Sequence, residues 1–101
     1  MGRDAKGVLL DWLRERGRVI VAGNREYFDC IDFVPPDRFV RFGGDSTTNQ
    51  EEYRYDIGDD EVYRLLLEHW RSEAVRFGGT PLTTEKDVAE YVRAREPFTS
   101  D

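Results

Sequence analysis

The sequence predicts an α+β fold with an N-terminal helix, a three- or four-stranded antiparallel sheet, a long central helix and a short C-terminal helix. Two observations lead to it. Apolar residues recur at helical spacing through 59–77, whereas three stretches between residues 18 and 42 are rich in β-branched and aromatic residues. No helix is predicted between the strands, so short connections favour antiparallel neighbours. We expect residues 1–101 to form a single α+β domain, since about 60 residues often suffice for independent folding.

The first helix is predicted over residues 4–16. Its apolar stripe consists of Val8, Leu9, Trp12 and Leu13. Asp4 is placed to cap the free N–H groups at its start, and Gly17 is expected to end it.

The strands follow directly. Residues 18–22 and 27–34 are predicted to form a hairpin, because both are rich in strand-forming residues and Gly23-Asn24 lies between them. Pro35-Pro36-Asp37 breaks the second strand, and residues 38–42 are expected to form the third.

A polar segment separates this third strand from a short alternating stretch. Residues 45–52 contain no apolar side chain and no periodicity, so we expect an exposed, mobile loop that is dispensable for folding. Residues 53–57 alternate and are a candidate fourth strand.

The central helix is predicted over residues 59–77. Its apolar face comprises Val62, Leu65, Leu66, Trp70 and Ala74. Asp59 is expected to cap its start, Gly78-Gly79 to end it, and Trp70 to lie in the core.

A last helix is predicted after Thr83 or Thr84, either of which can cap it. Its apolar residues are Val88, Tyr91 and Val92. Pro97 is expected to end it, leaving a frayed tail.

The composition indicates a very soluble chain, because 36% of its residues are charged. Its single cysteine cannot form an internal disulfide, and no apolar run is long enough to cross a membrane. We therefore expect a cytoplasmic protein that does not bind membranes, whereas the oligomeric state is left open.

The net charge of −6 is concentrated in one segment. Residues 45–61 contain seven carboxylates and one arginine, Arg54, which also sums to −6. The predicted partner-binding residues are Asp45, Glu51, Glu52, Asp56, Asp60 and Glu61. The leading hypothesis is a small protein–protein interaction module, such as an adaptor, immunity-type or inhibitor protein, that binds a basic partner or mimics nucleic acid. The competing interpretation is a solvated loop joined to an ordinary helix start.

A second hypothesis is a nucleic-acid-binding domain that uses arginine and aromatic side chains of the sheet. Its candidate residues are Arg18, Arg25, Arg38, Arg41, Tyr27 and Phe42. The neighbouring acidic segment would repel phosphate, so this hypothesis ranks second.

Enzymatic activity has the least support in the sequence. His69 is the only histidine and Cys30 the only cysteine, and each is more typical of a packed residue than of a nucleophile or metal ligand. We expect no catalytic residues, no metal site and no cofactor.

Overall fold

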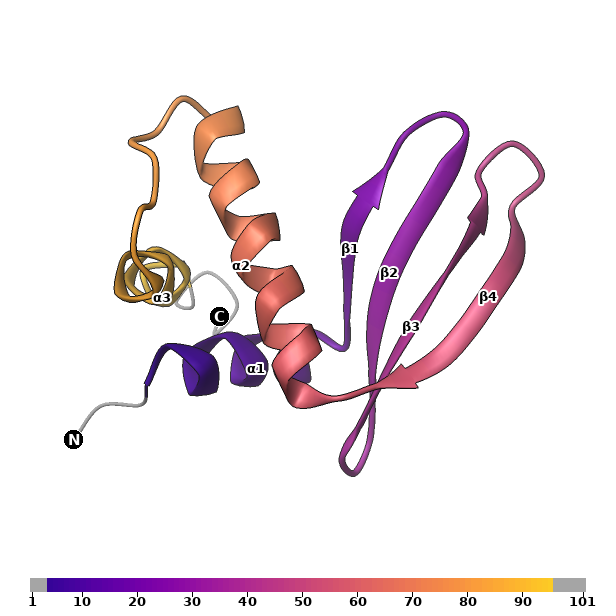
Figure 1. The fold of residues 1–101 in the computed structure, drawn as a ribbon, viewed down its shortest axis with the longest axis horizontal. Coiled ribbons are helices and arrows are strands. Elements are labelled where there is room, and N and C mark those ends of the chain that lie inside the picture. The colour runs from indigo at the N-terminus through magenta and orange to yellow at the C-terminus, as the bar shows by residue number, and fades with distance from the viewer. Residues whose placement is uncertain (1–3, 96–101) are drawn as a thin grey trace.

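The computed structural model describes residues 4–95, which form three helices and one sheet (Figure 1). In chain order the elements are α1 (Ala5–Arg16), β1 (Arg18–Gly23), β2 (Tyr27–Val34), β3 (Arg38–Asp45), β4 (Gln50–Ile57), α2 (Asp59–Arg76) and α3 (Glu85–Arg93). The four strands are antiparallel and lie in the order β1-β2-β3-β4. The predicted α+β fold is therefore confirmed, with four strands.

The predicted caps of the outer helices are confirmed. The Asp4 carboxylate accepts a hydrogen bond from the Gly7 N–H at 2.8 Å, and Gly17 ends α1 with a φ of 87°. Thr84 caps α3 in a capping box with Asp87, which satisfies backbone N–H groups at both positions. Helix α3 ends at Arg93, before the predicted end at Pro97, which lies outside the described residues together with the predicted tail.

The predicted cap of the central helix is wrong. Gly58 is the N-cap of α2 and makes no side-chain cap, while Asp59 is already the first helical residue. Gly58 leaves β4 in an extended conformation, which moves the helix start back by one position. Asp59, Asp60 and Glu61 remain in the first turn, where their charges oppose the positive end of the helix dipole.

The predicted loop over 45–52 is too long. Strand β3 continues to Asp45 and β4 begins at Gln50, so the connection is residues 46–49. Backbone pairing between two strands needs no apolar side chain, and the polar composition of this segment therefore concealed the strand ends. The Asp45 carboxylate stabilises the turn by accepting hydrogen bonds from the Thr47 N–H at 2.8 Å and the Thr47 hydroxyl at 2.6 Å.

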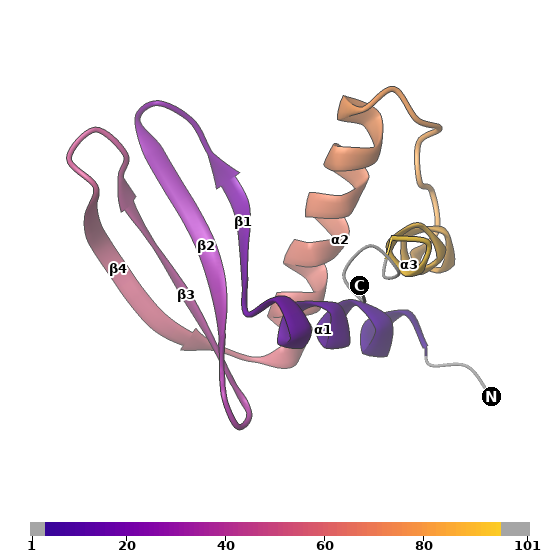
Figure 2. The same cartoon turned by 180° about the vertical axis from the view of Figure 1, so that it is seen from behind.

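The core lies where the three helices meet one end of the sheet. Its helical residues include Leu9, Trp12, Leu13, Val62, Leu66, Trp70, Val88 and Val92, and its strand residues are Val19, Ile31 and Phe39. Trp12 and Trp70 meet edge to face with ring centroids 4.9 Å apart. Toward the β1–β2 and β3–β4 turns, the strands diverge from α2 (Figures 1 and 2).

On the face of the sheet turned away from the helices, arginine side chains cover Phe42. Phe42 is buried beneath the guanidinium groups of Arg18 and Arg54, which lie 4.8 and 4.7 Å from its ring centroid. Its strand neighbour Cys30 is also buried, as the sequence predicted. Among the described residues, no helix is both long and apolar enough to cross a membrane.

Replacement of Trp70 by alanine should lower the free energy of unfolding by about 3–5 kcal/mol, because it leaves a cavity between three helices. Trp70→Phe should cost less, since the indole N–H is buried without a hydrogen-bond partner. Urea denaturation followed by circular dichroism measures both changes. Val75→Ala is the matched control, because Val75 lies on the same helix and is 58% exposed. An unchanged midpoint for Trp70→Ala would contradict this packing.

Candidate binding groove between β1 and α2

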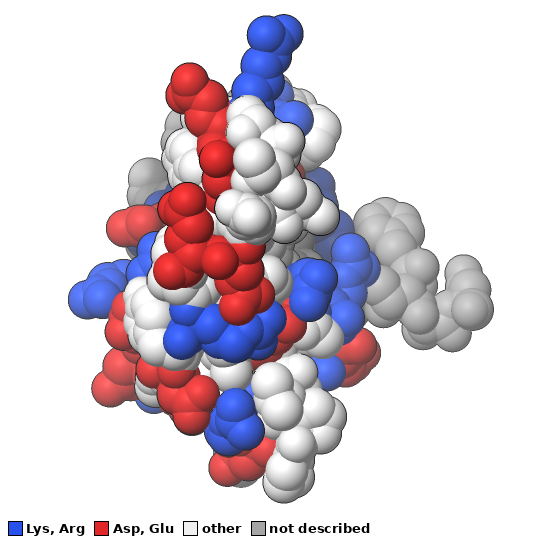
Figure 3. All heavy atoms as spheres, turned by 90° about the vertical axis from the view of Figure 1, so that its right-hand side faces the viewer, with Lys and Arg blue, Asp and Glu red and all other residues white. Residues whose placement is uncertain are grey.

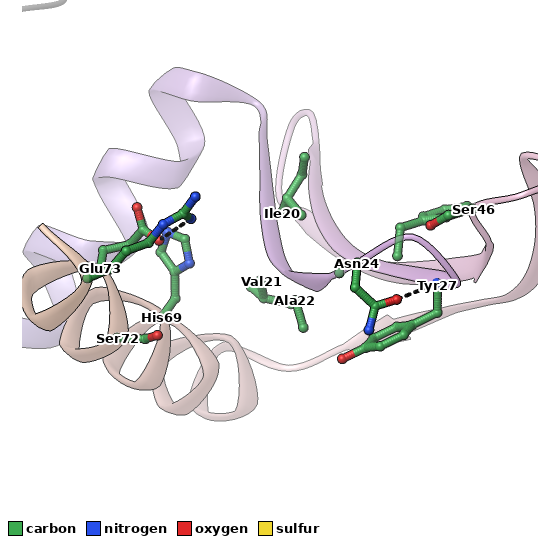
Figure 4. A pocket seen from close by; sticks show the side chains of 12 residues that line it. Ile20, Val21, Ala22, Asn24, Tyr27, Ser46, His69, Ser72 and Glu73 are labelled. Atoms are coloured by element: carbon green, nitrogen blue, oxygen red, sulfur yellow. Dashed lines mark hydrogen bonds and ion pairs between the residues drawn. The ribbon is translucent and has the colours of Figure 1, made fainter.

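A groove separates β1 from the C-terminal half of α2 (Figure 4). Its α2 wall consists of His69, Ser72, Glu73 and Arg76, which share one helix face at i, i+3, i+4 and i+7. Its strand wall consists of residues 20–24. The outer part encloses about 530 Å³, and an inner part of about 280 Å³ reaches Leu65 and the sheet. Val21, Ala22, His69 and Ser72 line both parts, so the two hollows adjoin each other.

A bulge in β1 shapes the strand wall. Ile20 pairs with Cys30 and Ala22 pairs with Asp29, so Val21 is an extra residue on β1. Strict alternation would point Val21 and Ala22 to opposite faces of the sheet. Because the bulge interrupts the alternation, both residues border the groove.

The floor of the inner groove is a polar row across the sheet. Asp29 pairs with Gly43, and Gly43 pairs with Tyr53 on the next strand. A Cβ on Gly43 would lie 2.2 Å from the Tyr53 hydroxyl oxygen, so only glycine lets the tyrosine cross β3. The Tyr53 hydroxyl donates to the Asp29 carboxylate at 3.0 Å, and Arg41 donates to its two oxygens at 3.1 and 2.7 Å.

This row holds a buried charge that is fully paired. Among the described residues, Asp29 is the only charged residue that is buried. Its ion pair with Arg41 raises the pKa of the arginine. Burial, together with the hydrogen bond to Asp29, raises the pKa of Tyr53 to about 12. The tyrosine therefore stays neutral and remains a donor at physiological pH.

His69 lies on the helix side of the groove. It is half-buried, and desolvation lowers its pKa, against a smaller opposing effect of Glu73. Cys30 faces the opposite side of the sheet, next to Arg18 and Phe42, and burial raises the pKa of its thiol. The sheet thus lies between the histidine and the cysteine. No cluster of three potential metal ligands occurs among residues 4–95.

The predicted acidic partner-binding residues lie on β3, β4 and the start of α2, and none of them lines the groove. Four of them form ion pairs: Glu51 with Arg54 at 2.8 Å, Asp56 with Arg38 at 3.3 Å, Asp60 with Lys6 at 2.5 Å, and Glu61 with Arg41 at 3.5 Å. Three of these cations, Lys6, Arg38 and Arg41, lie outside residues 45–61 and therefore were not included in the charge count for that segment. Figure 3 accordingly shows acidic and basic side chains interspersed along the β4 side. Glu52 forms no ion pair within the described chain.

The predicted nucleic-acid-binding residues do not form an open stacking platform. Arg18 pairs with Asp32 at 2.5 Å, and Arg38 and Arg41 are paired as described above. Phe42 is buried, whereas Tyr27 is exposed and lines the groove. Arg25 is exposed in the β1–β2 turn.

Sequence reasoning missed the groove, although one signal for it was present. The polar residues His69, Ser72, Glu73 and Arg76 form a second stripe on α2, beside the apolar stripe that packs in the core. Such a stripe is usual for a solvated helix face. This polar stripe lines a groove only because β1 lies opposite it in the folded chain.

Comparison with protein families, curated proteins and solved structures finds no match to this chain. The groove must therefore be interpreted from its own residues.

Tyr53→Phe should lower the free energy of unfolding by about 1–2 kcal/mol, because it removes one donor from the buried Asp29 carboxylate. Tyr55→Phe is the matched control on the same strand, where no hydrogen bond of the hydroxyl is found among the described residues, and it should change stability by less than about 0.5 kcal/mol. Equal urea midpoints for the two variants would show that the polar row contributes nothing to stability.

The stability of the domain should fall as the pH is lowered through the ordinary histidine pKa of 6.5. The unfolded chain takes up a proton there, whereas the folded chain, whose His69 has a lowered pKa, does not until lower pH. His69→Gln should remove this dependence, since no other histidine is present. Chemical denaturation between about pH 5 and pH 8 tests it. A parent protein and variant with parallel pH profiles would show that His69 is not desolvated.

Proposed function

We propose that this protein is a protein-binding module whose groove takes an extended segment of a basic partner as an additional strand on β1. One observation carries the proposal: an edge strand runs along the groove and faces a helix that does not cover it. The proposal keeps the class of function expected from the sequence and moves the contact site from the acidic segment to the groove.

The edge of β1 supplies the main binding energy in this arrangement. Strand β1 pairs only with β2 within the described sheet, so its outer N–H and C=O groups have no strand partner. An added strand satisfies such groups through main-chain hydrogen bonds, and alternate side chains then enter neighbouring pockets. Here those pockets lie between the β1 residues Val21 and Ala22 and the α2 residues His69 and Ser72.

The charges of the groove favour a basic segment. Its lining contains the carboxylates Asp29, Glu68 and Glu73, of which Asp29 is paired with Arg41 at 2.7 Å and Glu73 with Arg76 at 3.5 Å. Glu68 is exposed and forms no ion pair in the described chain, so it is available to a partner's lysine or arginine. The net charge of −6 adds a long-range attraction that accelerates encounter with a basic protein.

A variant that fills the groove tests the site. Peptides selected for binding to the parent protein from a randomised displayed library should be enriched in lysine, arginine and β-branched residues. Ser72→Trp should weaken their binding by at least about tenfold, because the indole occupies the space of the added strand. Val75→Trp is the matched control, since Val75 is exposed on the same helix outside the groove. Calorimetric titration measures both affinities, and equal losses in the two variants would refute the groove.

Hydrogen exchange tests the mode of binding. A bound peptide should slow exchange of backbone amides in residues 20–23, since an added strand accepts hydrogen bonds from the edge. Amides of β4 provide the internal control, because β4 is the opposite edge of the same sheet. If the peptide slowed amide exchange only in β4, the partner would bind the β4 edge and the proposed site on β1 would be wrong.

A further inference from the structure

Strand β4 is the second free edge of the sheet. It pairs only with β3 within residues 4–95, and seven of its eight residues are exposed. After Gly58 the chain turns into α2, which lies on the β1 side of the molecule and leaves the β4 edge uncovered (Figure 1). We propose that this edge pairs with the same edge of a second copy of the chain, in an antiparallel arrangement about a two-fold axis.

The geometry of β4 limits the register of such a pairing. Gly43 pairs with Tyr53 and Gly44 with Glu51, so Glu52 is an extra residue and the alternation is interrupted there. The regular part of the strand is therefore residues 53–57, which ends where Gly58 precedes α2. Complete overlap of this part with its copy puts Tyr55, its central residue, opposite Tyr55 of the second copy.

The charges of β4 are complementary in this register. Arg54 lies opposite Asp56 of the second copy, and two-fold symmetry repeats this contact. Tyr53 lies opposite Ile57 of the second copy on the other face of the sheet. If the two-fold axis passed beside Arg54, that arginine would lie opposite its own copy, and an axis beside Asp56 would place two aspartates opposite each other. Both arrangements bring like charges together. Only the register centred on Tyr55 combines complete overlap with opposite charges.

The ion pairs already present extend across the contact. Asp56 is paired with Arg38 and Arg54 with Glu51, while both inner side chains, Arg54 and Asp56, remain about half or more exposed. The proposed dimer therefore forms a row of alternating charge, from Arg38 and Asp56 of one copy to Arg54 and Glu51 of the other. Such rows attract more effectively than isolated surface pairs.

Engineered cysteines test the register directly. Directly opposed residues have Cα atoms about 4.5–5.5 Å apart, which a disulfide can bridge. Tyr55→Cys should therefore form a disulfide-linked dimer under mild oxidation. Glu52→Cys is the matched control, because Glu52 is also exposed on β4, whereas the two copies of residue 52 would lie about 20 Å apart along the strands. The parent chain controls for Cys30, which is buried.

Sedimentation over a wide concentration series tests the association itself. The parent protein should dimerise near physiological ionic strength, which screens the repulsion between two copies of net charge −6. Asp56→Arg should weaken the dimer by on the order of tenfold, and the added change Arg54→Asp should restore it, because the opposed charges are exchanged. Circular dichroism checks that both variants fold.

Either of two results would overturn the proposal: a parent protein that stays monomeric at every concentration, or equally fast cross-linking of Glu52→Cys and Tyr55→Cys. Neither result bears on the groove, which lies at the opposite edge of the sheet.

Discussion

The ion pair between Asp29 and Arg41 determines where the core of this protein ends. At one end of the sheet Val19, Ile31 and Phe39 face the helices and join a continuous apolar core. Two residues along each strand, next to Ile31 on β2 and Phe39 on β3, the same face of the sheet instead presents the paired Asp29 and Arg41. A helix could cover these charges only at the cost of desolvating a guanidinium group that is still partly exposed. The sheet and α2 therefore diverge, and the space between them is the groove.

Two backbone features adapt the sheet to this arrangement. The bulge at Val21 turns two successive small or medium apolar residues of β1 toward the groove. Gly43 leaves room for Tyr53 to cross β3 and complete the hydrogen bonding of Asp29. The apolar rim of the groove thus depends on the extra residue Val21, and its polar floor depends on the absence of a side chain at Gly43. Both features lie in the sheet rather than in α2.

The electrostatic character of the chain changes between sequence and structure. A count along residues 45–61 gives almost uncompensated acidity, yet Lys6, Arg38 and Arg41 supply cations from α1 and β3. The net charge of the whole molecule is unaffected by this pairing and still favours encounter with basic partners. What the pairing removes is a single acidic pole on the β4 side (Figure 3). The proposed binding therefore rests on backbone edges rather than on the acidic segment.

The sequence by itself determined the order of the elements, most of their boundaries, the cap at Asp4 and the burial of Trp70, because these depend on local periodicity and on side chains close in the chain. It left the cap of the last helix open between Thr83 and Thr84, and the structure places it at Thr84. It misplaced the start of β4 and the cap of α2, where backbone pairing and an extended glycine decided the outcome. The groove, the pairing of Asp29 with Arg41 and the pairing of Asp56, Asp60 and Glu61 with cations from outside the acidic segment were decided only by the tertiary structure. Each of them joins residues from different elements, and the register between strands, which places those residues together, is not written in any single stretch of the chain.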